Sequence, residues 1–397
     1  MRPASGCKLF GAYQALGGIQ DGVVLLHSVV GCNFGSMSLH VAQDMRDIRQ
    51  TCTVISDSDV VFSGEASLER AVRSALELFQ PSVLFVVSGC VSEMIGDDIP
   101  AVLARIPHEA PLLHVEAAGF RGDAARGLEA GWLALLPRPY PRPYPRSDPR
   151  PLVNLIGLGM DDPHAADDVE ALRAMLAPQA ALGAVLSRCT LEEVRRAPYA
   201  DVNLVLRGKG RELAQAMKEY FGIPWEELDY PYGAAGADDL WSRLERRFGL
   251  DYHQARAELD RQIAEGAGKA YRYLQALYGM PAAILASGPR ADGLRRFLEQ
   301  ELGMEVVCFA RREELSDQED FYRELRGSEA ALLFGSSFEQ DGADELEIPL
   351  IRMDYPVFDE VCLTPRPHLG GQGTLHLLED IFRGIMNGRT LKGALYQ

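Results

Sequence analysis

The stretches VVLLHSVVGC (residues 23–32) and SVLFVVSGC (82–90) decide the fold class of this chain. Each begins with a continuous apolar run of strand length, which is typical of a strand buried on both faces of a parallel sheet. Between them, SLERAVRSALELF (67–79) places its apolar residues at helical spacing. Together the three segments predict a strand–helix–strand unit with parallel strands.

The same alternation of strand and helix continues to the end of the chain. Further strands are predicted at LVNLIGLG (152–159), VNLVLRG (202–208), PAAILASGP (281–289), MEVVCFA (304–310), AALLFGSS (330–337) and IPLIRMDYP (348–356). Helical patterns are VEALRAMLA (169–177), ELAQAMKEYFG (212–222), GLRRFLEQELG (293–303), the polar segment 240–279 and the C-terminal HLLEDIFRGIMNG (376–388). This rhythm predicts several α/β domains with parallel sheets.

A proline-rich segment gives the clearest domain boundary. PRPYPRPYPRSDPRP (137–151) holds seven prolines and four arginines, which forbids a helix and favours an extended, exposed linker. We therefore predict an N-terminal α/β domain at 1–136, which carries the first cysteines. A second α/β domain with a helical segment is predicted at 152–279, and a third with a C-terminal helix at 280–397.

The composition excludes several classes of protein. Apolar residues make up 47% of the 397 residues and charged residues 24%, so a mostly disordered chain is excluded. The formal net charge of −17 argues against nucleic acid or an anionic membrane as the main partner. No apolar run reaches the roughly 20 residues that span a bilayer, and the N-terminus lacks the order of a secretory signal. We expect a cytoplasmic protein.

Three of the seven cysteines directly follow a glycine. These are Cys7, Cys32 and Cys90, and the last two come at the ends of the predicted strands, where parallel sheets carry their ligands. The trio could be small buried hydrophobic residues or thiolates in tight loops. Because iron–sulfur clusters usually take four or more cysteines, a cluster here would need ligands from another chain or a non-cysteine residue. Cys52 is a spare thiol, but it has neither a glycine nor a predicted strand end beside it.

Eight segments of the chain, in order, resemble motifs of nitrogenase component 1 and its relatives. They are SGCKLFGAYQALGGI (5–19), LLHSVVGC (25–32), DVVFSGEASLERAV (59–72), SGCVSEMIGDDIPAVL (88–103), AAGFRG (117–122), YFGIPW (220–225), LLFGSSFEQ (332–340) and IPLIRMDYPVFDE (348–360). The spacing of 25 and then 58 residues between Cys7, Cys32 and Cys90 is similar to that of β-type subunits. The resemblance covers nearly the whole chain.

The resemblance implies three Rossmann-like domains, each with a parallel sheet and flanking helices. It also makes Cys7, Cys32 and Cys90 this chain's ligands to an iron–sulfur cluster shared with a homologous partner subunit. In nitrogenase-like enzymes that cluster is an eight-iron P-cluster, [8Fe-7S], and in tetrapyrrole-reducing relatives it is [4Fe-4S].

Two departures from the α-type pattern make the chain resemble a β-type, electron-relaying subunit. Leu206 lies about where catalytic α-type subunits have the cysteine that anchors their large cofactor. His368 lies near the α-type histidine ligand, but its glycine-rich surroundings look β-type. The sequence also opens six residues before Cys7, which favours the shorter reductases, such as methylthio-alkane reductases, over the nitrogenase β subunit itself.

The other residues singled out by the sequence each have a structural interpretation beside a functional one. Asp123, after GFRG, could bind oxidised iron, as an oxygen-bearing residue does near this point in related β subunits, or could cap the next helix. Asp97 and Asp98 fit a turn and a helix start better than a metal site. His27 fits a hydrogen-bonded core histidine better than a ligand, and Cys308 fits a strand core.

The resulting expectation is a β-type subunit of a nitrogenase-like reductase. It would pair with an α-type subunit as an α2β2 heterotetramer, accept electrons from a transient, homodimeric, ATP-dependent iron protein, and relay them through the shared cluster. The sequence has no G-x-x-x-x-G-K-[ST] phosphate loop and no acid–base pair or activated nucleophile, so reduction of a substrate such as a methylthio-alkane would occur in the partner. The alternatives are a scaffold for nitrogenase cofactor assembly and a homodimeric nickel-tetrapyrrole reductive cyclase.

Overall fold

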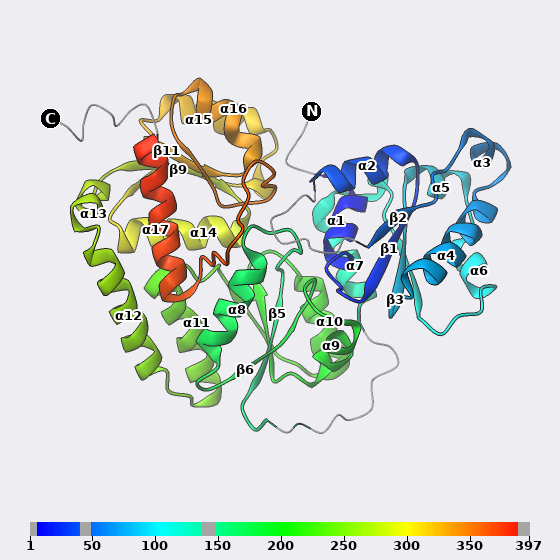
Figure 1. The fold of residues 1–397 in the computed structure, drawn as a ribbon, viewed down its shortest axis with the longest axis horizontal. Coiled ribbons are helices and arrows are strands. Elements are labelled where there is room, and N and C mark those ends of the chain that lie inside the picture. Colours follow the sequence, from blue (N-terminus) through cyan, green and yellow to red (C-terminus); the bar gives the residue numbers. More distant parts are fainter. Residues whose placement is uncertain (1–5, 40–48, 137–145, 147, 388–397) are drawn as a thin grey trace.

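The computed structural model describes residues 6–39, 49–136, 146 and 148–387 of the chain. It contains three four-stranded sheets, and every strand pairs in parallel with its neighbours (Figure 1). The predicted α/β fold with three parallel sheets is therefore confirmed. Most of the predicted linker, 137–145 and 147, lies outside the described residues.

The first sheet has the strand order β2-β1-β3-β4. Its strands are β1 (Gly22–His27), β2 (Gln50–Cys52), β3 (Val83–Ser88) and β4 (Leu112–Glu116). Every residue of β1 and β3 is buried, as their continuous apolar runs predict for central strands. The first apolar run does not stay extended to residue 30, because α2 (Val30–Leu39) begins there.

The second and third sheets repeat this order, in which the strand that comes first in the sequence lies inside the sheet, next to an edge strand. The second sheet is β6-β5-β7-β8 and the third is β10-β9-β11-β12. Their strands are β5 (Leu152–Ile156), β6 (Ala181–Val185), β7 (Val202–Leu206), β8 (Trp225–Leu228), β9 (Pro281–Ala286), β10 (Glu305–Arg311), β11 (Leu332–Gly335) and β12 (Leu350–Arg352). In sheets of this topology, ligands bind beyond the carboxyl ends of the strands.

Helices cover the faces of the sheets (Figure 1). They are α1 (Lys8–Leu16), α3 (Asp57–Phe62), α4 (Glu65–Phe79), α5 (Cys90–Ile95), α6 (Ile99–Ala104), α7 (Ala124–Ala134), α8 (Ala165–Leu176), α9 (Leu191–Arg196), α10 (Arg211–Phe221), α14 (Gly288–Arg296), α15 (Gln318–Gly327) and α16 (Gln340–Glu345). The polar segment 240–279 is helical as predicted and forms α11 (Gly233–Phe248), α12 (His253–Gly268) and α13 (Tyr271–Leu277). The final helix, α17 (Gly370–Asn387), begins six residues before its predicted start. No described helix is long and apolar enough to cross a membrane.

Two glycines let α1 and α7 lie in backbone contact. A Cβ on Gly11 would lie 1.8 Å from the carbonyl oxygen of Ala124, and a Cβ on Gly127 would lie 1.9 Å from that of Lys8. Neither position has room for any side chain. The two helices run in the same direction, and the residues that precede them, Cys7 and Asp123, form a β-bridge.

Candidate metal centre

The three glycine-linked cysteines lie at helix starts above one edge of the first sheet. Cys7 is the N-cap of α1, Cys32 lies in the first turn of α2, and Cys90 is the first residue of α5. Because α2 follows β1 and α5 follows β3, and these strands are parallel neighbours, Cys32 and Cys90 share the carboxyl edge. All three thiols are partly exposed, so this edge presents sulfur to the surface.

Cys7 and Cys90 converge on Gly119, in the short helical turn η1 (Gly119–Arg121). A Cβ on Gly119 would lie 3.2 Å from the Cβ of Cys7 and 3.4 Å from the Sγ of Cys90. The Gly119 N–H donates a hydrogen bond of 3.1 Å to the Cys90 Sγ, and such N–H···S bonds stabilise thiolates and tune iron–sulfur clusters. Burial raises the pKa of the Cys7 thiol, and nearby Cys32 and Cys90 add to that rise.

Cys52 also lies at this edge, although the sequence predicted no strand end beside it. It is the last residue of β2, which pairs in parallel with β1, so it does stand at a strand end. The Cys52 Sγ lies 4.0 Å from the carbonyl oxygen of Val29, and the backbone N–H of Cys32 donates to the same oxygen at 3.1 Å. The sequence signal for it was weak because β2 is three residues long and its residues are half-buried.

Asp123 is a helix cap that lies beside a cysteine. Its side chain accepts a 3.1 Å hydrogen bond from the Arg126 N–H at the start of α7, which confirms the predicted capping role. Its backbone bridges to Cys7, and the residue is exposed. The carboxylate therefore lies in the neighbourhood of the thiols, while its role as an iron ligand stays a prediction.

The donors at this edge are cysteine thiols, the residues that hold iron–sulfur clusters. Within the described ranges, no three His, Cys, Asp or Glu side chains could hold one metal ion together. Ser28, fully buried directly after β1, has an Oγ without a hydrogen-bond partner among the described residues. A Cβ on Gly89 would lie 2.3 Å from that oxygen, so the orphaned hydroxyl lies at the same edge as the thiols.

Large apolar side chains surround this edge and face solvent. On α2, Phe34 is 72% exposed, on α5 Met94 is 74% exposed, and on η1 Phe120 is 60% exposed. Val30 and Met37 of α2 are exposed as well. A second exposed apolar group occupies the end of α3, where Phe62 is 84% exposed beside Val60 and Val61. Apolar patches of this kind mark protein interfaces.

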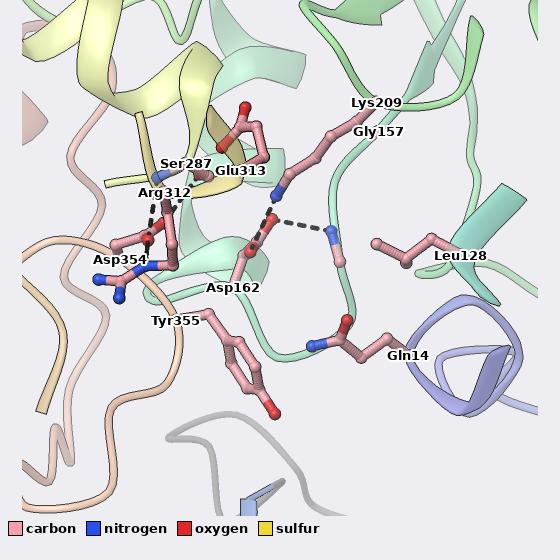
Figure 2. A pocket seen from close by; sticks show the side chains of 11 residues that line it. Gln14, Leu128, Gly157, Asp162, Lys209, Ser287, Arg312, Glu313, Asp354 and Tyr355 are labelled. Carbon is pink, nitrogen blue, oxygen red and sulfur yellow. Dashed lines mark hydrogen bonds and ion pairs between the residues drawn. The ribbon is translucent and has the colours of Figure 1, made fainter. Parts of the chain in front are cut away.

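A polar cavity of about 130 Å³ lies where the carboxyl edges of the second and third sheets meet Gln14 of α1 and Leu128 of α7 (Figure 2). Arg312 reaches the buried Asp354 at 3.0 Å and Glu339 at 2.8 Å. Burial opposes ionisation of Asp354, but Arg312, Lys209 and Arg290 outweigh it and hold the pKa of that carboxyl below its ordinary value. Ser287 donates to Asp354 through both its backbone and its hydroxyl. The cavity is thus lined by groups that already satisfy one another.

The remaining singled-out residues have structural partners. His27 is fully buried, and its ring nitrogens lie 3.1 Å from Thr53 Oγ1 and 3.0 Å from Asp97 Oδ2, which confirms it as a hydrogen-bonded core histidine. Asp98 caps α6 and Cys308 is buried in β10, both as predicted. Leu206 ends β7 and is buried. His368 pairs with Asp380 at 3.1 Å.

A family model described as "Nitrogenase component 1 type Oxidoreductase" matches residues 7–386. The chain therefore belongs to the nitrogenase component 1 family. It is 27% identical to the nitrogenase iron-molybdenum cofactor biosynthesis protein NifE of Rippkaea orientalis, over 96% of this chain and 84% of that protein. It is 25% identical to the nitrogenase molybdenum-iron protein alpha chain of Methanothermobacter marburgensis, over 96% of this chain and 87% of that one.

The solved structure titled "Nitrogenase Cp1 at pH 6.5" shares the fold. It superimposes with a TM-score of 0.81 over 98% of this chain and 93% of the solved chain, at 18% sequence identity. The family and the three-sheet architecture thus agree with the resemblance seen in the sequence. Similarity to both an alpha chain and a NifE protein defines the family but not the type of subunit.

Proposed function

We propose that this chain is the β-type subunit of a nitrogenase-like reductase. It accepts electrons from an ATP-dependent iron protein and relays them through an interface iron–sulfur cluster to a catalytic cofactor in an α-type partner. The observation that carries this proposal is the gathering of half-buried thiols at one exposed sheet edge. Thiolates that surround iron form an electron relay, and this site includes no acid–base pair or activated nucleophile.

The apolar rim around the thiols supports a cluster completed by a partner subunit. Cys7, Cys32 and Cys90 supply three ligands, whereas a P-cluster or a [4Fe-4S] cluster needs more. Phe34, Met94 and Phe120 are apolar and solvent-facing, and burying them against a homologous α-type chain would shield the cluster from water. The assembly that follows is an αβ pair with the cluster between its subunits, and an α2β2 heterotetramer in full.

The end of α3 offers a second surface for the transient iron protein. Val60, Val61 and Phe62 are exposed together, and α3 contacts α5, the helix that begins with Cys90. A protein docked there would bring its electron donor to the side of the thiols. ATP hydrolysis would occur in that protein, since this sequence has no phosphate loop.

The proposal places the catalytic site in the partner rather than in this chain. Leu206, at the end of β7, offers no thiolate. A methylthio-alkane is the proposed substrate. Its reduction in the partner would consume two electrons and two protons and release methanethiol and an alkane.

A non-catalytic assembly scaffold is the second candidate function. It is favoured by the identity to NifE proteins, which reaches 30% over 76% of this chain for the protein of Methanosarcina barkeri. A scaffold would carry a cofactor precursor and release it to an apo-enzyme. Methanethiol formation by the purified complex, supplied with iron protein and ATP, supports the reductase, whereas transfer of a metal cofactor without turnover supports the scaffold.

The cluster assignment is tested with cysteine variants of the co-expressed complex. We expect Cys32→Ala and Cys90→Ala each to lose most of the interface cluster, because each removes the terminal ligand of one iron. Cys308→Ala, in the core of β10, is the matched control and should cost only packing. Iron analysis and electron paramagnetic resonance measure the outcome. Unchanged cluster signals in both ligand variants would overturn the proposal.

A further inference from the structure

Glu93 is a buried carboxylate beside the turn that contacts Cys90. It lies on α5, one helical turn after Cys90, and its side chain is 6% exposed. Its Oε1 accepts hydrogen bonds of 2.9 Å from the backbone N–H groups of Ala117 and Ala118 and one of 2.8 Å from the Ser88 hydroxyl. Hydrogen bonds from backbone N–H groups to a carboxylate are charge-assisted and stronger than neutral ones. Glu93 therefore fixes the backbone of the two alanines.

The backbone that Glu93 holds leads directly to a donor for the Cys90 sulfur. Gly119 follows Ala118 in the sequence, and its N–H donates to the Cys90 Sγ at 3.1 Å. Three successive N–H groups thus bind side chains of α5, two of them the Glu93 carboxylate and the third the Cys90 sulfur. Because these peptide units are covalently joined, a shift of the carboxylate would change the direction of the Gly119 N–H.

Glu93 also holds the surface side of the same turn. Arg121 is paired with Glu93 Oε2, in a contact that is an ion pair and not a hydrogen bond. The Arg121 guanidinium also lies 3.1 Å from Glu116, and its side chain is 45% exposed. Neighbouring Phe120 is 60% exposed and belongs to the apolar rim around the thiols. One carboxylate thus holds the turn that carries both the N–H donor to the sulfur and part of the proposed partner surface.

We propose that Glu93 is a positioning residue of the interface cluster, which aims the Gly119 N–H at the Cys90 sulfur and thereby raises the reduction potential of the cluster. This rests on the proposed function, in which Cys90 binds iron. An N–H dipole attracts a cluster more strongly once it has gained an electron, so N–H···S bonds favour the reduced form. The negative charge of Glu93 acts in the opposite direction, because it repels the added electron. Substitutions can separate the two contributions.

Two conservative variants of the co-expressed complex separate position from charge. Glu93→Asp keeps the charge but shortens the side chain by one methylene, so the N–H groups lose their acceptor and the midpoint potential should fall below that of the wild type. Glu93→Gln keeps the reach and an acceptor oxygen but loses the charge, so the potential should rise. Redox titration followed by electron paramagnetic resonance measures both shifts. A wild-type potential in Glu93→Asp would overturn the proposal.

Glu301, which lies just before β10 of the third sheet, is the matched control. Its half-buried carboxylate also accepts from two successive N–H groups, those of Ala234 and Ala235 at the start of α11, both at 3.0 Å. Glu301→Asp should therefore lower the melting temperature and leave the midpoint potential unchanged. If Glu301→Asp shifts the potential as much as Glu93→Asp does, the shift does not come from the turn beside Cys90, and the proposal is overturned.

Ser88→Ala gives an answer even where Glu93→Asp does not assemble. It removes one hydrogen bond from the Glu93 carboxylate and no charge, so the potential should fall, by less than in Glu93→Asp. A wild-type potential in Ser88→Ala would then overturn the proposal. If Cys90→Ala loses the cluster while these variants keep the wild-type potential, only the role of Glu93 fails. If Cys90→Ala keeps the cluster, the cluster assignment itself fails.

Discussion

The carboxyl edge of the first sheet turns its thiols toward solvent, whereas the carboxyl edges of the other two sheets pair their polar groups with one another. All three sheets have the same strand order and end in loops that carry polar groups. At the carboxyl edge of the third sheet, Arg312 after β10 pairs with Glu339 after β11 and with Asp354 after β12. At the first sheet, thiols and apolar side chains face outward.

This difference distinguishes a sheet edge whose charged groups are satisfied within the chain from one whose thiols could bind a ligand. The buried charges at the carboxyl edge of the third sheet pair with one another, and removing one partner would leave the others uncompensated. Half-buried thiols contribute little to stability by themselves, so their convergence is better explained by a ligand. Within one chain, the same topology thus provides one sheet edge with paired, buried charges and another with partly exposed thiols.

Removing the charge of Arg312 should destabilise the carboxyl edge of the third sheet. Arg312→Leu would leave Asp354 and Glu339 buried without their cation, and breaking a buried pair in this way costs about 3–5 kcal/mol. Urea denaturation measures the free energy of unfolding. Arg323→Leu is the control, because its ion pair with Asp320 is exposed and surface pairs are worth about 1 kcal/mol or less. Equal losses in both variants would show that these buried charges do not stabilise the edge of the third sheet.

Adding a side chain between α1 and α7 should displace Cys7 and so damage the thiol site at the edge of the first sheet. Gly127→Ala places a methyl group 1.9 Å from the Lys8 carbonyl oxygen, and overpacking of this kind costs about 1–3 kcal/mol. Because the same contact positions Cys7, iron content should fall along with the melting temperature. Gly268→Ala, at a helix position with open space around it, is the matched control. Full iron content in Gly127→Ala would contradict the supporting role.

Substitutions of Asp123 should have the smallest effect on stability, and they test whether the metal site includes this residue. Asp123→Ala should cost about 1 kcal/mol through the lost cap, whereas Asp123→Asn should keep the cap and the stability. If the carboxylate also binds oxidised iron, both variants shift the midpoint potential of the more oxidising step and leave the reduced spectrum unchanged. Redox titration decides between the roles, since an unmoved potential in both variants leaves Asp123 as a cap alone.

The sequence predicts the central strands better than the edge strands. The runs that form β1, β3, β5, β7, β9 and β11 are continuous and apolar because both faces of these strands are covered. Four edge strands were not predicted, namely β2, β4, β6 and β8. They are short or partly exposed, and partial burial does not require an apolar run. The last residue of β2 is Cys52, so a missed edge strand also hid a thiol of the site.

The site itself was predicted only where its signal is local. A glycine next to a cysteine can be read from neighbouring residues, and it singled out Cys7, Cys32 and Cys90. The packing of Gly11 against α7 could not be predicted, because the two helices are over a hundred residues apart in the sequence and each glycine looks ordinary in its own segment. The orphaned Ser28 hydroxyl also depends on packing between segments that are distant in sequence.

The bridge between Cys7 and Asp123 can form only after the segment up to α7 has been synthesised. A ribosome adds roughly 5–20 residues per second, so α7 follows Cys7 by about 6–25 seconds. During that interval the first cysteine has no helix to pack against, and the thiols cannot converge. Iron delivered to the nascent chain would meet scattered thiols, whereas iron delivered after α7 has emerged would meet an assembled edge. Under the proposed function, the packing of α1 on α7 would therefore delay metal loading until the whole first domain has been synthesised.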